Sequence, residues 1–410
     1  MPILKLVFLF CFLVFLLRRW LLGHALFLAA VLGGLMQGLT PWQIGISFVN
    51  TLSNPQNLLL LCCIILSILI FAHSLSKTGY IKRVIEAYQG IFPWPQLNLM
   101  MLPSLIGLLP MPGGAIFSAP LVKSLGQPLK ISSTRLALIN YWFRHTWEYT
   151  WPLYPGLILA IHLGRLDLLN LILIDIPITL VAFSLGFVFF LKPVKGKMPK
   201  SNKNVLGFLK EIAPILVVIL LTVCGELIFH FLPKEITIGL AVWIGIIWVW
   251  WRQKITWFQF LSILKDKTLL KVLYAVLAIF FFKQILTDSQ IVLDTSKTLI
   301  TYHVPLALIT AGLPFLVGLI VGLTLAFVGS TFPLIFSLLE VAHVPILPYI
   351  MLAFCSGIVG VLLSPMHLCL VLSIEYFQVE FGKTYRQLYL PCALMLLGIV
   401  TWFAILRHLC

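Results

Sequence analysis

The chain has 410 residues, of which 61% are hydrophobic and only 10% are charged, and its mean hydropathy is +1.07. A soluble chain of this length has too little interior to bury so much apolar surface, so the composition excludes a soluble globular protein and indicates a membrane protein. The net charge of +15 does not indicate nucleic-acid binding, because the Lys and Arg residues lie in short segments between apolar runs.

A membrane span needs about 20 apolar residues to cross about 30 Å of hydrocarbon. Candidate spans lie at residues 3–17, 21–39, 57–75, 134–163, 166–191, 212–232, 236–251, 269–287, 345–378 and 388–407. The first run resembles a signal peptide, but Arg18 and Arg19 stand where a small-residue cleavage site is expected. We therefore expect it to remain as a span.

Two of these spans are too long for one plain helix, and each contains a break. The breaks are predicted at residues 150–156 and at residues 364–367. Two further apolar segments, 97–122 and 304–341, are predicted to be re-entrant hairpins. Their turns are placed at residues 109–114 and 329–333. Each limb of the first hairpin has about a dozen residues, which at about 1.5 Å per residue reaches only the middle of the bilayer.

The distribution of basic residues predicts the orientation. If the Lys-rich segment 192–210 is cytoplasmic and each hairpin returns to its own side, 21 Lys and Arg residues fall inside and 5 outside. Such a bias is typical of the cytoplasmic loops of membrane proteins. The sequence therefore predicts a multi-pass protein of the cell (inner) membrane with both termini outside.

The same layout contains an internal repeat. Residues 1–191 form the first repeat, with five spans and the hairpin 97–122. Residues 192–210 form a basic cytoplasmic linker, and residues 211–410 form the second repeat, with five spans and the hairpin 304–341. Because five is odd, the second repeat is inserted upside down. The predicted fold is an all-α polytopic membrane protein with about ten transmembrane helices plus two re-entrant hairpins, in two inverted-topology repeats typical of secondary transporters.

Three ionisable residues lie within one turn of the first broken span. Asn140, Arg144 and Glu148 form one stripe at helical spacing, and His145 flanks it. Charged groups in a membrane cost several kcal/mol unless they are paired or solvated, so they are expected to point inward. In a transporter Arg144 would bind a substrate carboxylate, and Glu148 or His145 would carry a coupling proton. The alternative is that Arg144 and Glu148 pair with each other and only fix the helix.

The hairpin turns provide further candidates for substrate binding. Gly113 and Gly114 permit close backbone approach to an anion, and Ser118 adds a hydroxyl group. The segment Gly329, Ser330 and Thr331 is interpreted in the same way for the second hairpin. The alternative for both segments is tight helix packing through small residues.

The remaining candidates lie beside the second break and in the fifth span. Ser364 and His367 are expected to line the site, although a lone histidine is often only a hydrogen-bonded core residue. Asp175 would bind a coupling cation or be a buried, hydrogen-bonded acid. The eight cysteines are interpreted as small hydrophobic residues, so we expect neither a metal site nor an organic cofactor.

Three segments, 108–120, 140–148 and 363–369, resemble an uncharacterised integral-membrane family, domain of unknown function 401, over nearly the whole chain. That family is grouped with the ion transporter superfamily. The resemblance implies two re-entrant hairpins, a midplane site and often a dimer with a moving half and a scaffold half. Dicarboxylate members of the sodium-coupled branch carry Ser-Asn-Thr at each hairpin turn, whereas this chain has Pro-Gly-Gly-Ala and Gly-Ser-Thr.

Together these patterns predict a secondary transporter that moves a small anion, an organic carboxylate, with H⁺ or Na⁺ as coupling ion. The expected partners are this anion, the lipid bilayer and a second copy in a homodimer, and no nucleic acid. The first alternative is a cation/proton antiporter that uses Asp175, Glu148 and His367. The second is a membrane enzyme acting on a lipid-linked substrate, although the sequence has no HExxH or GxSxG motif and an enzyme is not expected.

Overall fold

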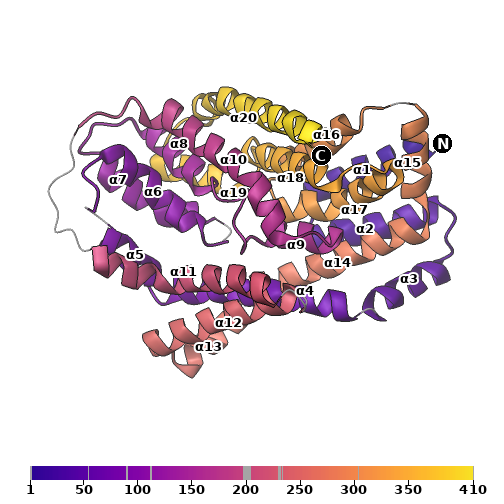
Figure 1. Cartoon of the computed structure of the whole chain (residues 1–410), viewed down its shortest axis with the longest axis horizontal. Helices are drawn as coiled ribbons and strands as arrows, with labels where there is room; N and C mark the ends of the chain where they lie inside the picture. The colour runs from indigo at the N-terminus through magenta and orange to yellow at the C-terminus, as the bar shows by residue number, and fades with distance from the viewer. Residues whose placement is uncertain are drawn as a thin grey trace.

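The computed structural model describes residues 2–53, 55–88, 91–110, 113–196, 205–229, 232, 234–302 and 304–409. Every regular element within these residues is a helix, so the prediction of an all-α protein is confirmed. Many of the long helices, among them α4, α11 and α20, run along the longest axis of the molecule (Figure 1).

The described residues before position 197 form the first series of helices, and α10 ends in a short π-helical segment, η1 (Phe187–Leu191). The α-helices are α1 (Pro2–Leu17), α2 (Leu22–Met36), α3 (Pro41–Ser53), α4 (Pro55–Lys77), α5 (Tyr80–Tyr88), α6 (Pro95–Gly107), α7 (Ala115–Gly126), α8 (Ser133–Arg144), α9 (Pro155–Gly164) and α10 (Leu168–Gly186).

The second series begins after the predicted linker, of which residues 197–204 lie outside the described residues. Its helices are α11 (Val205–Ile228), α12 (Lys234–Gln253), α13 (Trp257–Leu264), α14 (Lys267–Asp288), α15 (Ile291–Thr301), α16 (Leu306–Val321), α17 (Thr324–Ala342), α18 (Ile346–Leu362), α19 (Leu368–Phe377) and α20 (Phe381–Leu409).

Several helices are suited to a membrane by length and composition. In the described part of the chain, seven helical segments are long and apolar enough to cross a bilayer. They belong to α4, α10, α11, α12, α14, α17 and α20. The predicted spans 3–17 and 21–39 form α1 and α2, which are shorter, with 16 and 15 residues. The chain is a multi-pass membrane protein.

The predicted breaks are present in both long spans. The first separates α8 from α9 and covers residues 145–154, so it begins earlier than the predicted 150–156. The reason lies in His145, whose Nδ1 is 2.7 Å from the carbonyl oxygen of Tyr141, the group that would accept the His145 backbone N–H in a continued helix. Pro155 then starts α9 at a position where a missing N–H costs nothing. The second break covers residues 363–367.

The first hairpin has the predicted form. Its limbs, α6 and α7, have 13 and 12 residues and pack against each other. The turn between them includes Gly113, whose φ of +69° lies in the left-handed region that favours glycine. A Cβ atom at Gly113 would also lie 2.9 Å from the Leu372 side chain of α19, so this position needs glycine for two reasons.

The turn of the second hairpin is not where the sequence predicts it. The segment 329–333 lies inside α17, and the chain turns instead at Gly322, which ends α16 with a φ of +70°. Ser330 and Thr331 can be buried within this helix because each hydroxyl group donates to a carbonyl oxygen one turn earlier, at a distance of 2.7 Å. With 19 residues, α17 is also long enough to cross the bilayer.

The helix order repeats after ten elements, and the helix packing repeats with it. Helix α2 packs against α14, and their counterparts α12 and α4 pack against each other. The pairs α7 with α19 and α17 with α9 are related in the same way, as are α1 with α15 and α11 with α5. Each half therefore fills the interior of the other rather than forming a separate core.

Candidate functional site

The two breaks meet inside the molecule through their histidines. His145 follows α8, and His367 stands immediately before α19. Their Nε2 atoms are 2.9 Å apart, and only 2% and 9% of the two residues is exposed. Two of the sequence-predicted site residues, 222 positions apart in the chain, are thus in direct contact.

Arg144 connects the first hairpin to this contact. Its guanidinium donates from Nη1 to the carbonyl oxygen of Ile106 at 3.2 Å and from Nη2 to that of Leu109 at 3.3 Å. These carbonyls lie at the C-terminal end of α6, where the last backbone acceptors have no partner within the helix and the helix dipole is negative. The guanidinium also packs over Gly114, where a Cβ atom would lie 2.3 Å from Nη2.

His367 connects the second hairpin to the same place. Its Nδ1 is 2.9 Å from the carbonyl oxygen of Gly322, the residue at which that hairpin turns. The approach is tight, because a Cβ atom at Gly322 would lie 2.8 Å from the Ser364 hydroxyl oxygen and 3.0 Å from the His367 backbone nitrogen. Ser364 itself accepts from the backbone N–H of Met366 at 3.2 Å. Both hairpins and both breaks are therefore joined in one polar cluster.

Glu148 lies within the first break and is buried. The Tyr154 hydroxyl group donates to its Oε1 in a short hydrogen bond, and the same oxygen is 3.8 Å from Nε2 of His145. Glu148 is thus close to His145, and Arg144 contacts the carbonyls of α6. Pairing of Arg144 with Glu148, which was the alternative interpretation, is therefore not what orders the break.

Asn140 ties α8 to two other short helices. Its Nδ2 donates to the carbonyl oxygen of Ala115, at the start of α7, and to the hydroxyl oxygen of Ser373 in α19, at 3.0 and 2.9 Å. The Asn140 Oδ1 atom is buried and has no partner among the described residues. Ser118, also buried, donates to the same Ala115 carbonyl at 3.2 Å. These predicted site residues border the cluster.

Asp175 lies apart from the histidines, in the middle of α10. The Cys355 thiol of α18 donates to Oδ1 of this fully buried carboxyl group at 3.6 Å. The other oxygen, Oδ2, has no hydrogen-bond partner in the described part of the chain. Asp175 therefore has an oxygen available for a proton or a small cation.

Three predicted residues do not belong to the cluster. Gly329, Ser330 and Thr331 form part of the buried face of α17, and a Cβ atom at Gly329 would lie 2.5 Å from the Ile279 side chain of α14. Their small size serves helix packing, which was the alternative interpretation of this segment. In contrast, sequence reasoning missed Cys369, which the fold brings near His145, and Tyr154, whose partner Glu148 lies in the same break.

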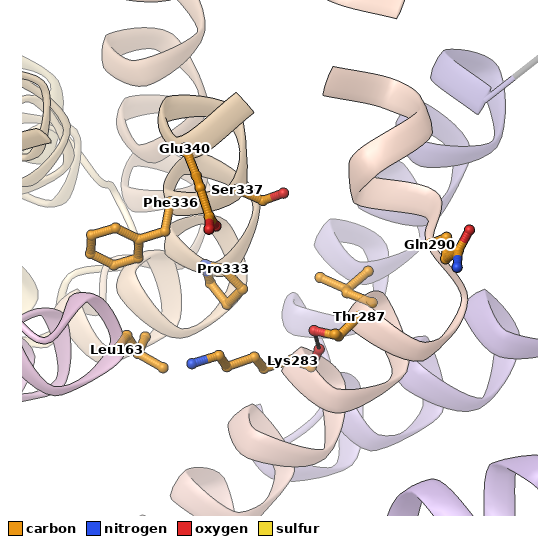
Figure 2. Close-up of a pocket in the computed structure, with 9 residues that line it drawn as sticks. Leu163, Lys283, Thr287, Gln290, Pro333, Phe336, Ser337 and Glu340 are labelled. Atoms are coloured by element: carbon orange, nitrogen blue, oxygen red, sulfur yellow. Dashed lines mark hydrogen bonds between the residues drawn. The ribbon is translucent and has the colours of Figure 1, made fainter. Parts of the chain in front are cut away.

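A pocket of about 430 Å³ lies away from the cluster, between α14 and α17 at the C-terminal end of α9. Lys283 and Glu340 point their charged ends into it (Figure 2). The remaining lining residues are Leu163, Leu286, Thr287, Gln290, Pro333, Phe336 and Ser337. Because α9 has 10 residues, one helix of about 15 Å separates this pocket from the break.

Comparison with known proteins gives a family and a fold. The family model described as "Protein of unknown function (DUF401)" matches residues 3–406. Among solved structures, the YdaH transporter of Alcanivorax borkumensis is similar with a TM-score of 0.60 and 12% identity, covering 88% of this chain and 87% of that one. Its structure is described as having an unusual topology. A search of curated proteins finds no match.

Proposed function

This chain belongs to the family described as protein of unknown function DUF401, and we propose that it is a secondary active transporter. It moves a small anion, an organic carboxylate, across the inner membrane by alternating access. The proposal is carried by one observation, the joining of two broken spans and two hairpins in one buried polar cluster. Interrupted helices in a membrane expose backbone groups that only protein or a water-filled cavity can receive, and paired interruptions are typical of a transporter's binding site.

The reciprocal packing of the two halves supports the same proposal. We infer that residues 1–191 and 211–410 are inverted repeats, because many pairs of contacting helices have a counterpart pair ten helices away in the chain. Transporters of this kind change access by moving one set of helices against another around a fixed site. The fold shared with a protein described as a transporter adds to this support.

The substrate is proposed to be an anion because the N-terminal ends of several helices, which carry partial positive charge, meet at the cluster. Helices α7, α9 and α19 all begin at the turn or breaks that form it, and helix N-termini favour negative charge. The buried Arg144 adds a guanidinium beside Gly114. We propose that the anion binds beside Arg144, Asn140, Gly113, Gly114, Ser118, Ser364 and His367.

Among the residues predicted to couple an ion, the geometry favours Asp175. Its carboxyl group is buried and has one oxygen without a partner among the described residues, so H⁺ or Na⁺ would find a place there. Glu148 and His145 instead bind each other and their neighbours within the break. The coupling ion is therefore proposed to act at Asp175 in α10 rather than on Glu148 and His145.

The arrangement of short helices supports the predicted orientation. Helices α5 and α13 lie toward the left of Figure 1, whereas α15 and the N-terminus lie toward the right. We propose that the left end is cytoplasmic and that both termini face outside. The pocket beside Lys283 would then open on the outer side as an entrance for the anion. The proposed surroundings are the bilayer and a second copy of the chain.

A cation/proton antiporter is the second candidate, and Asp175 is the observation that favours it. An antiporter needs an acid that binds a proton and a cation in turn, and the unpartnered oxygen of Asp175 meets that need. It needs no anion near Arg144. The two candidates therefore differ in which ligand stabilises the protein and in which residue the ligand needs.

Thermal stability of the detergent-purified protein against a panel of carboxylates, sulfate, phosphate and alkali cations tests the proposal. A ligand that binds only the folded state stabilises it by about 2.7 kcal/mol at a hundredfold excess over Kd. We expect a carboxylate to raise the unfolding temperature of the wild type. It should not raise that of Arg144→Lys, which keeps the charge but loses the planar fork of donors.

Each variant is compared with its own unliganded unfolding temperature, so that a change in basal stability does not count. Asp175→Asn serves as the second variant, because it retains the shape of the carboxyl group. Stabilisation by alkali cations alone, lost in Asp175→Asn and kept in Arg144→Lys, would exclude the anion transporter and favour the antiporter. Uptake of the stabilising anion into proteoliposomes then distinguishes transport from simple binding.

A further inference from the structure

Cys369 completes a group of three metal-ligating side chains, of which the proposed anion site uses only His367. One ligating atom each of His145, His367 and Cys369 lies within 4.8 Å of the other two. All three residues are buried, with Cys369 5% exposed. His145 comes from the first half of the chain, and His367 and Cys369 come from the second.

The hydrogen bonds of the two imidazoles fix where their protons are. Nδ1 of His145 faces the carbonyl oxygen of Tyr141, and Nδ1 of His367 faces that of Gly322. A carbonyl oxygen only accepts, so each Nδ1 carries a proton, and a ring that is neutral then has its lone pair on Nε2. These two Nε2 atoms face each other at 2.9 Å. Two lone pairs at this distance repel unless a cation lies between them or beside them.

We propose that His145, His367 and Cys369 bind a transition-metal ion of the zinc type. The donor set is that of zinc, because a thiolate and two imidazoles select such ions against Mg²⁺ and Ca²⁺. The Nδ1–H groups held by backbone carbonyls are the outer contacts that orient metal-bound histidines. Glu148 lies beside this group rather than in it, with its Oε1 3.8 Å from Nε2 of His145, and would help to balance the charge of the ion.

Metal binding requires little movement of these side chains. With bonds of about 2.0 Å to nitrogen and about 2.3 Å to sulfur, ligand atoms in a tetrahedral site lie about 3.3–3.6 Å apart. The two Nε2 atoms, at 2.9 Å, would separate slightly, and the thiolate would move inward from its present place within 4.8 Å. A shared proton would satisfy the two histidines equally well, but it gives no role to the thiol beside them.

The charges of the ligands also suit a divalent ion. A thiolate and the Glu148 carboxylate together neutralise its charge, which a buried site in a membrane protein requires. Because the ligands come from both halves, the ion joins the first break to the second. This inference goes beyond the proposed transport function and depends on neither substrate nor coupling ion.

Cobalt substitution in the detergent-purified, chelator-treated full chain tests the proposal. Titration with Co²⁺ should produce a thiolate-to-cobalt charge-transfer band and the visible bands of a tetrahedral site, saturating at one ion per chain. Zn²⁺ should displace the cobalt and Mg²⁺ should not. We expect Cys369→Ala to abolish the charge-transfer band and to weaken binding at least about tenfold.

Cys392→Ala is the matched control, because Cys392 is a buried cysteine of α20 outside the group of ligands, and it should keep the full signal. No charge-transfer band in the wild type, or an equal band in Cys369→Ala, would overturn the proposal and leave the two histidines sharing a proton. If Cys369→Ala does not fold, alkylation of the wild type followed by mass spectrometry decides. Zn²⁺ should slow the modification of Cys369 relative to Cys392, and unchanged relative rates would contradict the metal site.

Discussion

At the scale of single residues, Arg144 holds the first hairpin against the first break. Replacing it by alanine removes the donors to the Ile106 and Leu109 carbonyls and leaves a cavity beside Gly114. We expect Arg144→Ala to lower the free energy of unfolding by about 2–5 kcal/mol. Thermal unfolding in detergent, without ligand, measures this effect. Arg386→Ala, at an exposed position of α20, should change stability by less than about 0.5 kcal/mol, and equal stabilities would contradict the contact.

Gly322 provides a second test at this scale. Its left-handed backbone and the closeness of the Ser364 hydroxyl oxygen leave no room for a side chain. We expect Gly322→Ala to destabilise the protein by about 1–3 kcal/mol or more, since strain and steric contact add. Gly312→Ala in the same helix meets nothing within 4 Å and should change stability by about 1 kcal/mol at most. If both variants have the same unfolding temperature, the left-handed turn and close packing described at Gly322 would be contradicted.

The cluster could be predicted from the sequence only in part. Buried charge within an apolar span is a local signal, so Arg144, His145 and Glu148 could be selected without a structure. His367 could be selected because it stands beside a break. Cys369 could not, because a lone cysteine in an apolar run resembles a small hydrophobic residue until the fold brings His145 beside it.

At the scale of elements, the second hairpin shows which features of a turn can be predicted from local sequence and which cannot. The sequence Gly-Ser-Thr has the composition of a turn, but the same small residues also occur where two helices pack closely against each other. Only the positive φ of Gly322 and the packing of Gly329 on Ile279 distinguish the two, and both are properties of the folded chain. The first hairpin is predictable because two prolines and two glycines within residues 110–114 strongly favour a turn.

This distinction predicts different effects for neighbouring substitutions in α17. Gly329→Leu should lower the free energy of unfolding by about 1–3 kcal/mol, because a side chain there would push α17 away from α14. Ser330→Ala should leave both stability and anion binding nearly unchanged, since its hydroxyl group only donates to the Ala326 carbonyl. Stability and ligand-induced stabilisation are measured by thermal unfolding. Loss of ligand-induced stabilisation in Ser330→Ala would return this segment to the binding site.

At the scale of the whole molecule, the central question is whether the two halves have opposite orientations. The repeated helix order makes α15 the counterpart of α5, and each lies at a different end of the molecule (Figure 1). Inverted repeats place such counterparts on opposite sides of the membrane, whereas parallel repeats place them on the same side. The excess of basic residues in the segments around α5 predicts a cytoplasmic position for that helix.

Labelling of single cysteines introduced into α5 and α15 tests whether the two helices lie on opposite sides of the membrane. Glu86 in α5 and Asp294 in α15 are both exposed acidic residues, so their replacement by cysteine forms a matched pair. The background variant lacks Cys11, Cys63 and Cys410. In intact cells a membrane-impermeant maleimide should label Asp294→Cys but not Glu86→Cys. After the membrane is permeabilised, it should label Glu86→Cys as well. Labelling of both cysteines, or of neither, in intact cells would place the two helices on one side and exclude inverted halves. An alternating-access site shared between the two halves would then lose the symmetry on which it depends.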